Sequence, residues 1–142
     1  MKRTPLKRKT GLKRGTGLKR GDSRMKRLSG GRATQETRYR EALNRKLEDW
    51  DRRCEGCGLV LPCTPSHLIP RSYDITLLED PENFHFHCEK CANKCELGEW
   101  PSMLDGRVIY EYIEKTRPKY LKIKELSYSD RHGISYSEAS WV

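Results

Sequence analysis

Two Cys-x-x-Cys pairs separated by 30 residues constrain this chain more than any other feature of its sequence. The four residues are Cys54, Cys57, Cys88 and Cys91. Two thiolates spaced in this way can bind one ion from a tight turn, and two such pairs complete the tetrahedral Cys₄ shell that zinc prefers. Gly56 and Gly58 favour the same interpretation, because a turn that carries metal ligands needs backbone freedom. The spacing therefore predicts a structural zinc site.

Two other uses of cysteine fit the sequence less well. Disulfides belong to oxidising compartments, and the N-terminus MKRTPLKRKTGLKR is basic without the apolar run of a secretory signal. A redox-active Cys-x-x-Cys normally needs a single pair on a βαβ unit, which the sequence does not indicate. Cys63 and Cys95 remain outside the pairs; either is a candidate to replace a ligand or to be a buried free thiol.

The length and composition predict one small domain. The chain has 142 residues, of which only 35% are hydrophobic, so a large core is not expected. A structural zinc site can contribute roughly 10 kcal/mol or more to folding, which would offset a thin core. We expect a domain over residues 34–126, a disordered basic tail over 1–33 and a loose C-terminal tail over 127–142. No apolar run has the length of a membrane span.

The positive charge is concentrated at the N-terminus. Residues 1–27 carry 12 Lys or Arg and one acid, whereas the rest of the chain has a net charge of about −2. A six-residue repeat here places a Lys-Arg pair in each copy, and its Gly and Pro residues fit neither a helix nor a strand. We expect the pairs to contact nucleic-acid phosphates; they are Lys7, Arg8, Lys13, Arg14, Lys19 and Arg20. A solubilising or localising tail is the alternative.

Periodicity predicts helices and short strands, and hence an α+β fold. Apolar residues at three- and four-residue steps predict an amphipathic helix over 34–53 that packs on the segment following it. We expect short strands at 59–61 and 83–87, a helix that begins at Cys91 and ends near Gly98, and a helix over 108–115 that stops near Pro118.

The segment between the cysteine pairs carries a second motif. It reads Ser66-His67-Leu68-Ile69-Pro70-Arg71-Ser72, and Asn83 lies five residues before Cys88. Together with the cysteine pairs, this segment resembles the HNH (ββα-metal) endonuclease family, in its zinc-containing phage and bacterial branch. The resemblance covers roughly residues 50–98. It implies a small zinc-stapled, treble-clef-like ββα finger flanked by helices.

The resemblance also implies roles for individual residues. His67 matches the general base that activates water, and Asn83 matches the residue that orients the loop bearing it. The family's ligands for a catalytic divalent ion fall at Ser66 and Ala92, and alanine cannot bind a metal. Asn93 and Glu96 lie close in sequence and, with Ser66 and water, offer oxygen ligands for Mg²⁺.

Two further histidines, His85 and His87, alternate on the second expected strand and so point to one face of it. Ordinary strand positions are the simplest interpretation, with phosphate contact or metal ligation as the alternative. The function that the resemblance implies is metal-dependent hydrolysis of DNA phosphodiester bonds in the cytoplasm of a bacterial or phage-infected cell. The alternative is a catalytically inactive zinc-finger protein that binds or packages DNA or RNA.

Overall fold

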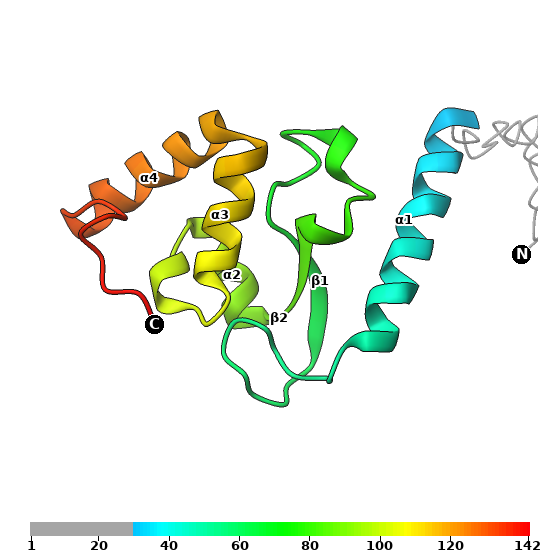
Figure 1. The fold of residues 1–142 in the computed structure, drawn as a ribbon, viewed down its shortest axis with the longest axis horizontal. Helices are drawn as coiled ribbons and strands as arrows, with labels where there is room; N and C mark the ends of the chain where they lie inside the picture. Colours follow the sequence, from blue (N-terminus) through cyan, green and yellow to red (C-terminus); the bar gives the residue numbers. More distant parts are fainter. Residues whose placement is uncertain (1–29) are drawn as a thin grey trace, which may run out of the picture.

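The structure of this chain is a computed structural model that describes residues 30–142 (Figure 1). These residues form four α-helices and one two-stranded antiparallel sheet, so the expected α+β class is confirmed for this part of the chain. The repeats with their Lys-Arg pairs lie outside the described residues. None of the helices in 30–142 is both long and apolar enough to traverse a bilayer.

A β-hairpin followed directly by a helix forms the centre of the molecule. Strands β1 (Cys63–His67) and β2 (Phe84–Cys88) pair from Cys63 opposite Cys88 to His67 opposite Phe84. Helix α2 (Glu89–Leu97) begins immediately after β2 and ends at Gly98, whose φ of 79° is readily adopted by glycine. The short 3₁₀ turns η1 (Ile75–Leu77) and η2 (Pro81–Asn83) lie between the two strands.

The first strand lies later in the chain than the sequence predicts. The expected strand at 59–61 is wrong: these side chains are exposed, and β1 begins at Cys63. The reason is local, because the Cys54 N–H donates to the Leu59 carbonyl at 2.9 Å and so holds Leu59 in the turn of the first cysteine pair.

Helix α1 (Gly30–Asp49) lies alongside the hairpin (Figure 1). The Tyr39 ring lies 5.7 Å from that of Phe84, and Trp50, just beyond the helix, stacks on Phe86 with ring centroids 4.4 Å apart. The Lys46 ammonium donates to the backbone carbonyls of Pro81 and Phe84. The predicted packing of this helix on the segment that follows it is therefore confirmed.

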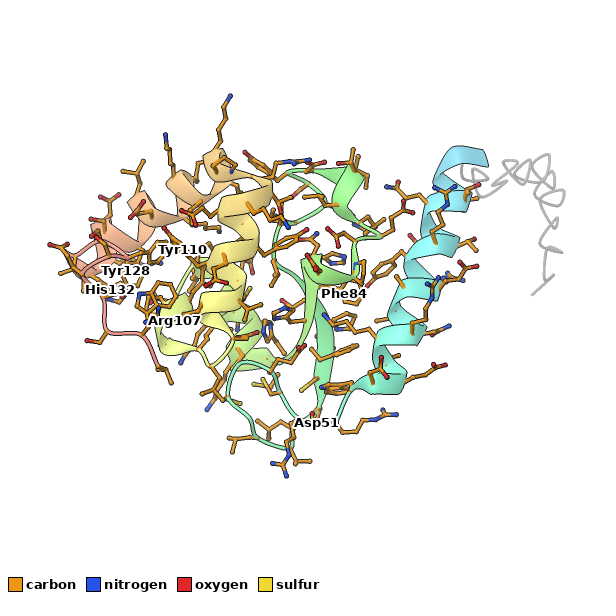
Figure 2. All side chains as sticks on the ribbon, viewed as in Figure 1. Asp51, Phe84, Arg107, Tyr110, Tyr128 and His132 are labelled. Carbon is orange, nitrogen blue, oxygen red and sulfur yellow. The ribbon has the colours of Figure 1, made fainter. Side chains whose placement is uncertain are left out.

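The C-terminal third is more ordered than the sequence predicts. After η3 (Trp100–Ser102) come α3 (Gly106–Thr116) and α4 (Pro118–His132). Pro118 begins a helix as well as ending one, because proline is favoured in the first turn, where its missing N–H has no helical partner. Figure 2 shows Tyr110 and Tyr128 on the side of the molecule formed by α3 and α4.

The segment 127–142 also differs from the loose tail expected there. Tyr136 is only 2% exposed, its hydroxyl donates to the Gly98 carbonyl at 2.7 Å, and its ring stacks on the fully buried Trp100. Burial of these rings offsets the entropy of ordering the segment.

Candidate metal centre and histidine site

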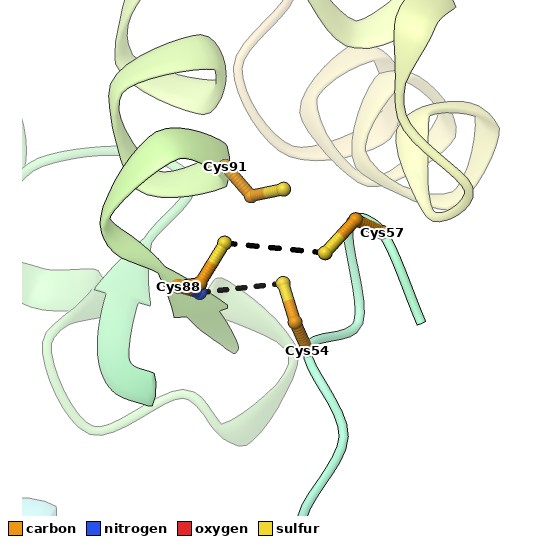
Figure 3. A group of neighbouring side chains, drawn as sticks. All are labelled: Cys54, Cys57, Cys88 and Cys91. Atoms are coloured by element: carbon orange, nitrogen blue, oxygen red, sulfur yellow. Dashed lines mark hydrogen bonds between the residues drawn. The ribbon is translucent and has the colours of Figure 1, made fainter. Parts of the chain in front are cut away.

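The four paired cysteines converge on one point (Figure 3). Their Sγ atoms all lie within 4.8 Å of one another, and the Sγ atoms of Cys57 and Cys88 are 4.0 Å apart. Thiolates bound tetrahedrally to zinc at about 2.3 Å are separated by roughly 3.8 Å. The arrangement of these side chains therefore fits one zinc ion.

Two different local structures supply the ligands. Cys54 and Cys57 lie in the turn before β1, whereas Cys88 caps the N-terminus of α2 and Cys91 lies in its first turn. A Cβ on Gly56 would lie 2.8 Å from the Cys91 Cβ, so only glycine lets the turn approach the helix this closely.

Hydrogen bonds fix the turn against its neighbours. The Glu55 N–H donates to the Phe86 carbonyl at 3.0 Å, and the Gly56 carbonyl accepts from the Leu104 N–H at 2.9 Å. Gly58, with φ of 72°, takes the left-handed conformation that closes the turn. The first ligand pair is therefore held against both β2 and the segment before α3.

The environment of Cys54 favours its thiolate. Burial acts to raise the pKa of Cys54, but backbone N–H groups, including that of Cys88 at 3.3 Å, outweigh it and lower this pKa to about 6. Burial raises the pKa of Cys91 above its ordinary value. Because zinc binds the thiolate form of cysteine, the N–H groups around Cys54 favour the form that zinc requires.

The two remaining cysteines are not members of the cluster. Cys63 donates from its thiol to the Leu61 carbonyl at 3.2 Å, and burial together with Cys54 raises its pKa to about 11. Cys95 is buried in the core, and this burial raises its pKa to about 12. Both therefore favour the protonated thiol.

Asn83 holds the loop that follows His67. Its side chain is fully buried; its amide nitrogen donates to the carbonyls of Ile69 and Leu77, both at 3.0 Å, and its Oδ1 accepts from the Ile69 N–H at 2.8 Å. Its backbone carbonyl also accepts from the Leu68 N–H at 2.7 Å. Asn83 thus uses side chain and backbone to fix the two residues directly after His67.

His67 ends β1 with its ring near α1. The ring lies 5.4 Å from Tyr39 and 5.9 Å from Phe84, and its Nε2 is buried with no hydrogen-bond partner. Burial lowers the pKa of His67 below 6.5, although the Leu78 backbone acts in the opposite direction. The imidazole is therefore neutral at pH 7.

Five of the residues considered for the catalytic site border one cavity of about 560 Å³. They are Ser66, His67, Ala92, Asn93 and Glu96. Asn93 and Glu96 are exposed on α2, whereas Ser66 is half-buried and pairs with His85 across the hairpin. Since neighbouring residues of a strand point to opposite faces, the Ser66 side chain lies on the other face of the hairpin from the His67 ring.

The sequence predicts only part of a second buried cluster. His85 and His87 share a face of β2, as the alternation predicts, and both contact Asp105, which precedes α3. Burial acts to raise the pKa of Asp105, but the two imidazoles outweigh it and hold that pKa well below its ordinary range. No pattern in the sequence links Asp105 to the two histidines.

The fold and the four cysteines define a small α+β protein with a Cys₄ cluster able to hold zinc. Comparisons of this chain with models of protein families, with curated proteins and with solved structures find no match.

Proposed function

We propose that this chain is a metal-dependent endonuclease of the HNH (ββα-metal) type that hydrolyses DNA phosphodiester bonds. The proposal is supported by the order of elements around the cysteines: a turn with two ligands, a hairpin, and a helix whose first turn carries the other two. On this proposal, residues 54–97 form a treble-clef-like finger and zinc has a structural role.

The observation that carries the proposal is the contact of Asn83 with the loop after His67. Asn83 makes four hydrogen bonds, two as donor and two as acceptor, and they hold the backbone at Leu68, Ile69 and Leu77. A general base must be held within hydrogen-bond reach of its water, and this loop fixes the backbone directly beside the imidazole.

The protein's own groups have separate roles in the proposed reaction. Neutral His67 takes the proton of a water molecule as that water attacks phosphorus, and Asn83 keeps the imidazole in place. Although Ser66 and His67 point to opposite faces of the hairpin, both border one cavity together with Asn93 and Glu96. Ser66, Asn93 and Glu96 offer hydroxyl, amide and carboxylate oxygens, a donor set that suits a hard ion such as Mg²⁺. When bound, such an ion would stabilise charge on the phosphate and on the leaving oxygen. The basic residues 7–20 would contact the DNA backbone.

Cleavage of supercoiled plasmid in Mg²⁺ or Mn²⁺ tests the proposal. His67→Ala should lower the rate by roughly 10²- to 10⁴-fold, the usual contribution of a general base, with zinc content and DNA binding unchanged. His132→Ala is the matched control, because this histidine pairs with Glu99 near the molecular surface, and it should cleave like the wild type.

Glu96→Ala tests the ion ligands separately. It should raise the Mg²⁺ concentration needed for cleavage before it abolishes turnover, because the base stays in place. Glu89→Ala, which alters another exposed glutamate of α2, should leave the Mg²⁺ requirement unchanged.

Ala92 favours a second candidate, a zinc finger that binds or packages nucleic acid without cutting it. A methyl group stands at the position where the resemblance calls for a metal ligand, and Ala92→His would restore it. If the wild type and Ala92→His are both inert on duplex, branched and single-stranded DNA, the nuclease proposal is overturned in favour of this binding role.

A further inference from the structure

The cluster of His85, His87 and Asp105 is not used by the zinc site or by the proposed reaction. Asp105 Oδ2 lies 2.6 Å from His85 Nδ1 and 2.7 Å from His87 Nε2. All three side chains are more than nine-tenths buried. The cluster brings a loop residue before α3 onto the face of β2 opposite to that of Phe86.

Hydrogen bonding alone leaves this cluster incompletely satisfied. Both imidazoles contact the same carboxylate oxygen, while Asp105 Oδ1 is buried with no partner. A buried polar atom without a partner is destabilising, and a buried carboxylate is stabilised by positive charge. A cation between the three side chains would supply that charge and engage Oδ1 as well as Oδ2.

The donor set also indicates a metal. Two imidazole nitrogens and one carboxylate form the ligand shell of many zinc and iron sites, and three protein ligands leave positions open for water. Donors bound at about 2.0–2.2 Å lie roughly 3 Å apart, so each imidazole nitrogen needs to move away from Asp105 Oδ2 by only a few tenths of an ångström. One ligand atom from each of the three side chains lies within 4.8 Å of the others.

One member of the cluster borders a cavity. His85 lines a cavity of about 880 Å³ between α1 and α3. Acidic and basic side chains border this cavity in nearly equal numbers.

We propose that His85, His87 and Asp105 bind one divalent transition-metal ion, separate from the zinc of the Cys₄ cluster. The site takes ions that accept imidazole nitrogen, such as Zn²⁺, Co²⁺ or Ni²⁺, in preference to Mg²⁺. It does not depend on the nuclease proposal, because His85, His87 and Asp105 have no role in the proposed reaction.

Titration with Co²⁺ of the full chain loaded with one equivalent of zinc, in excess Mg²⁺ to occupy oxygen sites, tests the proposal. Calorimetry should show one further equivalent bound. Visible absorption should show cobalt bands without the thiolate-to-cobalt charge transfer that would mark exchange into the Cys₄ cluster. In the wild type, the NMR signals of the His85 and His87 rings should shift or broaden with that equivalent.

Asp105→Asn is the informative variant, because it keeps the size of the side chain and removes its charge. Removal of a group that only orients a metal ligand weakens metal affinity by roughly 10- to 100-fold. The Co²⁺ affinity of this variant should fall by more than that, because Asp105 is proposed to be a ligand itself. The matched control is His132→Ala, since His132 also contacts a carboxylate, that of Glu99, and this variant should bind Co²⁺ like the wild type.

Three results would overturn the proposal. The first is a wild type that takes up no Co²⁺ beyond its one equivalent of zinc. The second is uptake of Co²⁺ that leaves the NMR signals of His85 and His87 unmoved. The third is an Asp105→Asn variant whose affinity for Co²⁺ is unchanged. If Asp105→Asn does not fold, the wild-type stoichiometry and ring signals decide the question by themselves.

Discussion

Asn83 and Ile69 are joined by a reciprocal pair of hydrogen bonds between one side chain and one backbone unit. The Ile69 N–H donates to Asn83 Oδ1 at 2.8 Å, and Asn83 Nδ2 donates to the Ile69 carbonyl at 3.0 Å. Only an amide side chain offers a donor and an acceptor in this geometry, which neither aspartate nor leucine can reproduce. The pair connects the end of the loop, where β2 begins, to its start beside His67.

Replacing this amide should therefore be costly. Asn83→Leu keeps the branched shape of the side chain but leaves buried groups of Ile69 and Leu77 without partners, so we expect a loss of about 2–4 kcal/mol in the free energy of unfolding. Urea denaturation followed by circular dichroism measures it. Asn93→Leu, at an exposed position of α2, should change stability by less than about 0.5 kcal/mol. Equal effects of the two variants would contradict the role of Asn83 in holding this loop.

The Cys₄ cluster predicts one tightly held zinc per chain. Cys57→Ser and Cys91→Ser should each lose this zinc and much of the folded structure, because metal binding and folding are coupled. Cys63→Ser is the control: its thiol lies outside the cluster, so zinc should be retained. Elemental analysis of protein never exposed to chelator checks the stoichiometry. A zinc content below about half an equivalent would exclude a structural site, given the tightness of such sites.

The basic N-terminus predicts salt-dependent binding to nucleic acid. Deleting residues 1–27, which carry a net charge of +11, should weaken DNA binding and flatten its dependence on salt. Each B-DNA phosphate that the shortened chain no longer neutralises should reduce the steepness of the logarithmic salt dependence by roughly 0.9. Fluorescence anisotropy over a range of salt concentrations measures the slope. The same slope before and after deletion would assign the phosphate-binding side chains to residues 28–142.

The lowered pKa of His67 predicts the pH dependence of the proposed cleavage. A base acts in its neutral form, so the rate should rise with pH through the pKa of His67 and then level off. Because burial lowers that pKa below 6.5, the midpoint of the rise should fall below pH 6.5 and the rate should be constant near pH 7. Initial rates of plasmid cleavage at saturating Mg²⁺ give the profile. A midpoint above pH 7 would assign the titrating group to another residue.

Gly106 lies directly against the backbone of Trp100, which leaves no room for a side chain. A Cβ at this position would lie 1.8 Å from the Trp100 carbonyl oxygen, so Gly106→Ala should destabilise the protein by about 1–3 kcal/mol or more. Gly31→Ala is the control in a helix with open space around it, and it should be neutral or stabilising by up to about 1 kcal/mol. Thermal denaturation compares the two. A Gly106→Ala variant as stable as the wild type would show that the backbone there can move away from Trp100.

The sequence by itself determined the features that depend on short-range geometry. Cys54 and Cys57 lie in one turn, and their spacing alone brings two sulfur atoms together. Strand alternation likewise placed His85 and His87 on one face, and helical periodicity predicted that α1 packs on the hairpin. In each case, the contact follows from the regular geometry of one element.

The tertiary structure alone decided which distant residues meet. Asp105 reaches the two histidines only because the segment before α3 is held against the turn of the first cysteine pair. Tyr136 is buried only because α4 brings it back to Trp100 and Gly98. Such contacts join residues 18 to 38 positions apart in the chain, and local periodicity carries no information about them. They form because the folded chain buries apolar and aromatic surface collectively, and that free energy depends on the whole packing arrangement rather than on any one segment.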